Sequence, residues 1–221
     1  MDSIIRLKEI ILQRFYAHTS NHVFTVAISG IDASGKGFIS KLLENKLQND
    51  GLKVANINLD PWQNPLTVRL QEKNGAKNFY ERVFRWNDVF EQLIIPLKQS
   101  GSIQLTAPLI RTHADEYYSF NFDYSSIDIL LIEAIFLFQN RYLPYYDLKI
   151  WIDCSFETGM KRAIDRNVER LDKTTLAHDY DTYYYPAQHY HFGKDQPRSC
   201  ADIIYCNDEL SGIVGHMTVN F

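Results

Sequence analysis

Cysteine is scarce in this chain of 221 residues, which contains only Cys154, Cys200 and Cys206. Their number is odd and no pair shows Cys-x-x-Cys spacing, so the pattern of a disulfide framework or of a metal or redox motif is missing. Cys154 stands in a strand-like run and is predicted to be a buried free thiol. Free thiols fit a reducing compartment.

The chain also lacks an excess of positive charge and a long hydrophobic run. Its formal net charge is −4, which argues against nucleic acid as a bulk partner because phosphate backbones attract basic surfaces. The longest apolar stretch, 127–138, contains Asp128 and Glu133 and is too short to span a membrane. No secretory signal opens the chain. We therefore expect a cytoplasmic protein that binds neither nucleic acid nor membranes.

Segments typical of strands and of helices alternate along the chain. The predicted strands are 23–29, 54–59, 127–134, 148–153 and 203–205, with a further short strand allowed at 102–107. The predicted helices are 3–17, 37–49, 79–99, 156–171 and 174–191, the last interrupted at Pro186. This alternation predicts an α/β fold with a parallel sheet of about five strands, covered by helices on both faces. We expect one domain over 1–221, with an N-terminal helix within 1–20.

Residues 30–37 read Gly-Ile-Asp-Ala-Ser-Gly-Lys-Gly and lie between a predicted strand and a predicted helix. In that context G-x-x-x-x-G-K predicts a phosphate-binding loop. The glycines let backbone N–H groups converge on phosphate oxygens, and the helix N-terminus adds partial positive charge. Lys36 is expected to reach the β- and γ-phosphates. The loop residues predicted to bind nucleotide are Gly30, Asp32, Ala33, Ser34, Gly35, Lys36, Gly37 and Phe38.

Gly37 stands where such loops usually carry Ser or Thr, whose hydroxyl binds Mg²⁺. Without that hydroxyl, the ion must be held by nucleotide oxygens, water and a carboxylate from elsewhere in the chain. The alternative is a degraded site that binds nucleotide and does not transfer phosphate.

Two acids close predicted strands, at the edge where doubly wound sheets bind ligands. Glu133 ends an apolar run and is predicted to bind Mg²⁺; the alternative is an acid that only supports a turn. Asp60 ends the strand over 54–59, where it could accept a proton from an incoming hydroxyl and share the metal. The alternative for Asp60 is an Asp-Pro turn.

Three arginines, Arg162, Arg166 and Arg170, are spaced by four residues and share one face of a predicted helix. Arginines that close over a phosphoryl group stabilise its negative charge. We therefore predict a lid over about 155–192, with Arg166 in a catalytic role, Arg162 on the nucleotide and Arg170 less well placed. The alternative is a solvated helix face paired with Asp165 and Glu169.

The segment 108–124 is polar, charged and aromatic, and it is predicted to run between two strands and to shape an acceptor pocket. Arg111, His113 and Tyr117 are its candidate substrate contacts, together with Trp62 next to the strand-end acid. A plain surface connection is equally consistent with this composition.

Taken together, the motifs resemble the uridine kinase–phosphoribulokinase family of phosphate-loop kinases over roughly residues 23–208. The segments that carry the resemblance are 30–36, 60–62, 78–81, 130–136, the pair Arg162 and Arg166, 185–188, 197–198 and 201–204. The amphipathic helix before the first strand is similar to the bacterial uridine kinase-like branch.

The resemblance implies a P-loop NTPase fold and a kinase that uses Mg²⁺. Its expected partners are ATP or GTP as donor and a small hydroxylated acceptor, with uridine or cytidine expected first. By the same resemblance Asp60 activates the acceptor hydroxyl, Glu133 assists Mg²⁺, Lys36 holds phosphates, and Arg162 and Arg166 belong to the lid.

The chain departs from the family pattern at Gly37, at Ala134 and at Ile110. Ile110 stands where many members carry an aspartate that contacts the substrate. Another acceptor, such as a pantothenate-like molecule or a sugar phosphate, therefore stays open, as does a non-catalytic nucleotide-binding protein. The sequence also leaves open a homo-oligomer.

Overall fold

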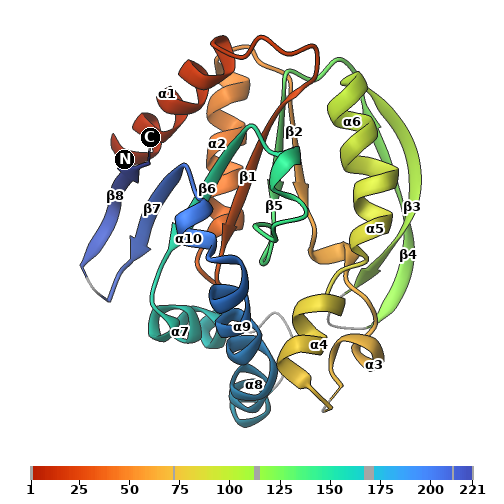
Figure 1. The fold of residues 1–221 in the computed structure, drawn as a ribbon, viewed down its shortest axis with the longest axis vertical. Helices are drawn as coiled ribbons and strands as arrows, with labels where there is room; N and C mark the ends of the chain where they lie inside the picture. The colour runs from red at the N-terminus through yellow and green to blue at the C-terminus, as the bar shows by residue number, and fades with distance from the viewer. Residues whose placement is uncertain (1, 72, 112–114, 167–171, 211, 221) are drawn as a thin grey trace.

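A six-stranded sheet in the order β2-β5-β1-β6-β7-β8 forms the centre of the structure (Figure 1). The computed structural model describes residues 2–71, 73–111, 115–166, 172–210 and 212–220. The strands of this sheet are β1 (Phe24–Gly30), β2 (Val54–Asn58), β5 (Ile129–Glu133), β6 (Leu148–Asp153), β7 (Ile203–Asp208) and β8 (Ile213–Val219). Strands β2, β5, β1, β6 and β7 run parallel, and β8 pairs antiparallel with β7.

Helices cover both faces of the sheet, as predicted (Figure 1). The helices are α1 (Asp2–Tyr16), α2 (Lys36–Asn49), α3 (Leu66–Arg69), α4 (Gly75–Arg82), α5 (Trp86–Val89), α6 (Ile95–Ser100), α7 (Phe156–Arg166), α8 (Lys173–Asp179), α9 (Tyr185–Asp195) and α10 (Pro197–Cys200). One face packs against α1 and α2, and the other against α4, α5, α6 and α9. Among the described residues, no helix has the length and apolar character needed to cross a membrane.

Strand β5 shows why the central strands are apolar on both sides. Ile129 and Leu131 join the cluster that contains α1 and α2, whereas Leu130 and Ile132 join the cluster on the opposite face. A strand buried on both faces needs a continuous apolar run, not an alternating one. The run therefore predicts the strand and its central position.

The predicted connection at 108–124 is wrong. It belongs to a two-stranded antiparallel hairpin, β3 (Ile103–Arg111) and β4 (Glu116–Tyr124), which lies outside the main sheet. One face of the hairpin is exposed to solvent, so most residues of β4 are exposed. The polar residues among them made the segment resemble a loop in the sequence. Strand β8 was not predicted either.

Two predicted helices differ in detail. The helix over 79–99 is divided, because α4 ends at Arg82 and α5 begins at Trp86. Pro186 does not interrupt its helix: the widened π-helical turn Tyr180–Tyr184 joins α8 to α9. Proline cannot donate to the carbonyl four residues earlier, and a wider turn accommodates this loss.

Cys154 is a free thiol, as expected, but it lies just past the end of β6 and is only half-buried. Burial raises the pKa of its thiol to about 12, so it is protonated near neutral pH.

An ion pair anchors the amino ends of the strands. The Asp147 carboxylate accepts hydrogen bonds from Lys98 Nζ at 2.6 Å and from the Thr25 backbone N–H at 2.8 Å. Lys98 is 8% exposed although it lies on α6. The pair ties α6, the start of β1 and the segment before β6 together.

We predict that Lys98→Met lowers the free energy of unfolding by about 2 kcal/mol, because it leaves the Asp147 charge without its cation. Urea denaturation at neutral pH measures the change. Lys53→Met is the control; Lys53 is exposed, and its replacement should change stability by less than about 0.5 kcal/mol. Equal stability of the two variants would contradict the prediction.

Candidate active site

Three neighbouring strands bring the predicted site residues to one edge of the sheet. In the pairing of β1, β5 and β2, Ile28 lies beside Glu133, and Glu133 lies beside Asn58. The loop after β1, the Glu133 side chain and Asp60 therefore meet at the carboxyl ends of these strands. They border a cleft of about 570 Å³. The residues that line it are Asp32, Ala33, Gly35, Lys36, Gly37, Phe38, Asn58, Asp60, Glu133, Arg162, Asp165 and Arg166.

The loop needs its glycines for two different reasons. Gly35 has a φ of 92°, in the left-handed region that favours glycine. A Cβ on Gly30 would lie 2.6 Å from both the Ile152 carbonyl oxygen and Ser34 Oγ, so no side chain fits there. These constraints place Lys36 at the first position of α2 and turn the N-terminus of that helix toward the cleft.

Arg162 braces the loop. Its Nη1 donates to the Ser34 carbonyl at 3.1 Å and its Nη2 to the Asn207 carbonyl at 3.1 Å, while Asn207 Nδ2 donates to the same Ser34 oxygen at 2.7 Å. Arg162 also lines the cleft, where its side chain could reach a bound nucleotide. The contact with the nucleotide itself stays a prediction.

Arg166 and the start of α7 lie close to the loop. Arg166 Nη2 lies 3.9 Å from Asp32 Oδ2, and the Tyr180 hydroxyl donates a hydrogen bond to the same carboxylate. A Cβ on Gly159 would lie 3.1 Å from the Asp32 carbonyl, so a glycine in α7 permits this close approach. The cationic end of α7 is thereby placed over the phosphate-binding loop. Arg170 lies outside the described residues.

The carboxylates of the cleft influence one another. Burial raises the pKa of Glu133 to about 7, Lys36 opposes this shift, and Asp60 and Asp32 add to it. Burial also raises the pKa of Asp60, against the opposing effect of Lys36. Neighbouring carboxylates repel one another when they ionise, and a bound cation offsets this repulsion. Carboxylate oxygens are also ligands that Mg²⁺ prefers. The donor set of the cleft therefore fits Mg²⁺.

Gly37 leaves room for Glu133. A Cβ on Gly37 would lie 3.2 Å from Glu133 Oε1, so the carboxylate approaches the position that a Ser or Thr side chain would occupy. An oxygen donor is therefore present where the usual hydroxyl is absent. Both interpretations of Gly37, a Mg²⁺ ion held by another donor and a degraded site, stay predictions.

Three of the four predicted substrate contacts do not line the cleft. Trp62 is fully buried, Arg111 is exposed at the end of β3, and Tyr117 is 51% exposed on β4. None of these three lines the cleft. His113 lies outside the described residues. The roles of all four in substrate binding stay predictions.

Two residues near Asp60 were not predicted from the sequence. Asn58 lines the cleft, and its Oδ1 accepts the Asp60 backbone N–H at 2.6 Å. Arg69 is 4% exposed, and its charge lowers the pKa of Asp60 against the effect of burial. Arg69 lies in the one-turn helix α3, which shows no periodicity in the sequence, so no signal there could have found it.

The predicted strand over 54–59 ends earlier, at Asn58, and Asp60 begins the one-turn 3-10 helix Asp60–Trp62 that follows β2. A parallel sheet with a glycine loop between β1 and α2, with Glu133 at the end of β5 and Asp60 in the turn after β2, is the fold of the P-loop kinases. The comparison with solved structures confirms this fold. A possible uridine kinase from Bacillus stearothermophilus has a TM-score of 0.72 at 22% identity, covering 92% of this chain and 97% of that one. The D-glycerate 3-kinase from Cryptococcus neoformans has a TM-score of 0.67 at 10% identity, covering 98% of this chain and 99% of that one.

Among curated proteins, a thymidylate kinase from Buchnera aphidicola is 25% identical over 162 residues, which span 68% of this chain and 74% of that protein. No family model matches the chain. The kinases it resembles act on different acceptors by their names, so the likeness defines the fold and leaves the acceptor open.

We predict that Glu133 makes the metal-free protein less stable as the pH rises. Its pKa is about 7 in the folded protein and 4.5 ordinarily, so between these values the unfolded chain has released a proton that the folded protein keeps. Stability must then fall as pH rises through this window. Between pH 5 and pH 8, we expect wild type to lose about 2 kcal/mol relative to Glu133→Gln.

Urea denaturation in EDTA at several pH values measures this difference. Parallel pH profiles of wild type and Glu133→Gln would show that Glu133 ionises normally.

Proposed function

We propose that this protein is a kinase that transfers the γ-phosphoryl group of ATP or GTP, with Mg²⁺, to a hydroxyl of a small molecule. The leading acceptor is a pyrimidine nucleoside, uridine or cytidine. The observation that carries the proposal is the presence of Lys36, Asp60, Glu133 and Arg166 around one cleft beside the phosphate-binding loop.

These groups divide the work of phosphoryl transfer, and Asp60 takes part in two of its tasks. The backbone N–H groups of the loop and Lys36 hold the donor phosphates. Asp60 accepts the proton of the attacking hydroxyl, and its raised pKa brings it closer to the range of an effective base near neutral pH. Arg166 stabilises charge on the transferred group. Glu133 and Asp60 would hold Mg²⁺, which supplies charge neutralisation between the phosphates.

The lid is part of this proposal. Helix α7 carries Arg166 and contacts the loop through Gly159, so closure of the segment 155–192 over bound nucleotide would complete the site. We also propose that the kinase is a single domain and that it acts in the cytoplasm.

The acceptor has a second candidate. Ile110 has an apolar side chain that is 1% exposed, so it cannot give a bound nucleoside the hydrogen bond that an aspartate there would give. An acceptor with an anionic group, such as a sugar phosphate or a pantothenate-like molecule, is therefore the second candidate.

An ADP-release assay with ATP and Mg²⁺ tests the proposal against uridine, cytidine, pantothenate and sugar phosphates. Release with uridine or cytidine supports the leading acceptor. Release only with an anionic acceptor supports the second candidate. Tight ATP binding without release for any acceptor would overturn the kinase and support a non-catalytic nucleotide-binding protein.

We predict that Asp60→Asn lowers kcat by 10²- to 10⁴-fold, because the amide cannot accept the proton. ATP affinity, measured by calorimetry, should change by less than about threefold, since the loop and Lys36 hold the phosphates. Asp123→Asn is the matched control, because Asp123 is exposed on β4. An unchanged kcat in Asp60→Asn would exclude the base role.

We predict that Glu133→Gln raises the Mg²⁺ concentration for half-maximal activity by roughly tenfold or more, because a charged ligand is lost. Adding Gly37→Ser to that variant should recover part of the Mg²⁺ affinity, since it returns a hydroxyl to the helix start. A Mg²⁺ titration of both variants at saturating ATP measures the effect. A double variant that responds to Mg²⁺ as the single variant does would show that position 37 does not face the ion.

A further inference from the structure

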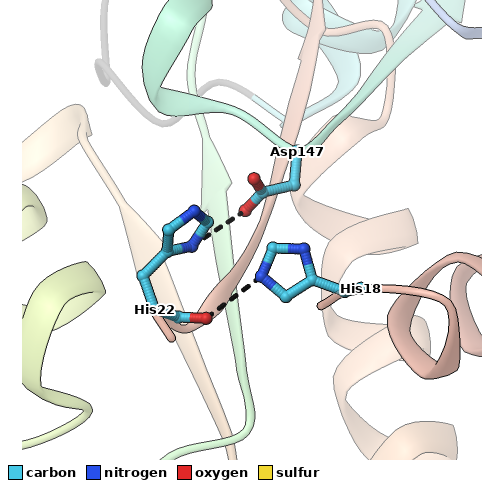
Figure 2. A group of neighbouring side chains, drawn as sticks. All are labelled: His18, His22 and Asp147. Carbon is cyan, nitrogen blue, oxygen red and sulfur yellow. Dashed lines mark hydrogen bonds and ion pairs between the residues drawn. The ribbon is translucent and has the colours of Figure 1, made fainter. Parts of the chain in front are cut away.

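A second group of metal-ligating side chains lies at the opposite edge of the sheet from the cleft. It consists of His18 and His22, from the segment between α1 and β1, and Asp147, from the residue before β6. Figure 2 shows the two imidazole rings lying next to each other beside the Asp147 carboxylate. One ligand atom from each residue lies within 4.8 Å of the other two.

The three side chains are held close by short contacts. His22 Nδ1 lies 3.8 Å from Asp147 Oδ2, and the two imidazole centroids are 4.7 Å apart. His18 Nε2 and His22 Nδ1 also lie 3.1 and 3.2 Å from the backbone carbonyl oxygens of His22 and Val23, so a metal ion bound through these nitrogens would replace their hydrogen-bonded protons. The fold therefore brings three side chains of metal-ligating type together from two segments that are far apart in sequence.

Two hydrogen bonds fix the orientation of the Asp147 carboxylate. The Thr25 backbone N–H and Lys98 Nζ both donate to Asp147 Oδ2, at 2.8 and 2.6 Å. Hydrogen-bond donors of this kind fix the orientation of ligating carboxylates in metal sites. The positive charge of Lys98 opposes a nearby cation, so moderate affinity is expected.

Access to the group is open. All three residues are partly exposed, and His18 and His22 line a surface cavity of about 660 Å³. A metal held by the three side chains would keep a coordination position for water. Two imidazole nitrogens and one carboxylate oxygen with one open position are a ligand set that Zn²⁺ accepts.

We propose that His18, His22 and Asp147 form a Zn²⁺-binding site that is separate from the cleft beside the phosphate-binding loop. Zn–N and Zn–O distances of about 2.0–2.2 Å require the ligand atoms to approach one another by about 1 Å. The histidines lie outside the helices and strands, in the segment 17–23, so rotation of their side chains can close this distance.

Isothermal titration with Zn²⁺ tests the proposal, using the full chain without nucleotide. It is run on the Glu133→Gln background, which weakens competing binding in the cleft. We expect one saturable site in the micromolar range. His18→Gln and His22→Gln should each weaken it by at least tenfold, whereas His216→Gln, which changes an exposed histidine on β8, should not.

Substitution with Co²⁺ gives a second readout, because visible absorption of the bound ion reports tetrahedral nitrogen and oxygen ligation. We expect this band in the Glu133→Gln background and in the His216→Gln variant, and not in the two other histidine variants. Thermal melting in EDTA checks that every variant is folded. Equal Zn²⁺ affinity of folded His18→Gln, His22→Gln and parent protein would overturn the proposal, as would absence of saturable binding in the parent.

Discussion

Parallel pairing of β2, β5 and β1 is the constraint on which the rest of the site depends. Because these strands run in the same direction, their carboxyl ends meet at one edge, and the register places Ile28, Glu133 and Asn58 side by side. The phosphate-binding loop, the buried acid and Asp60 come from segments more than 20 residues apart in sequence, yet the sheet brings them to one cleft. Helices on both faces bury the strands that hold this arrangement.

The cleft brings several charged side chains of both signs close together. Asp32, Asp60 and Glu133 gather where Lys36 and Arg166 also lie, and burial raises the pKa of Glu133 and of Asp60. A site of this kind costs folding free energy when it is empty, and it recovers that energy when cations and phosphates bind. Gly37 contributes to this arrangement because it has no side chain, which lets Glu133 Oε1 approach the start of α2.

Much of the fold could be predicted because the relevant signals are local. The apolar run of β5 predicts a strand buried on both faces, and the loop glycines predict a turn that only glycine tolerates. Strand β3 was predicted only over 102–107, and β4 was missed because its exposed side chains resemble those of a loop. Arg69 was missed because its importance comes from a neighbour, Asp60, and from no pattern of its own.

By itself, the sequence determined the glycine loop, the helix that follows it and the acid that closes β5, since each depends on residue types at short spacing. Tertiary structure decided which of these groups meet. It placed Glu133 against Gly37, set Arg162 behind the loop as a brace, and brought Asp147 beside His18 and His22 across more than 120 residues. Such contacts depend on strand order and helix packing, which only the folded chain establishes, because residues far apart in sequence have no local pattern that records their distance.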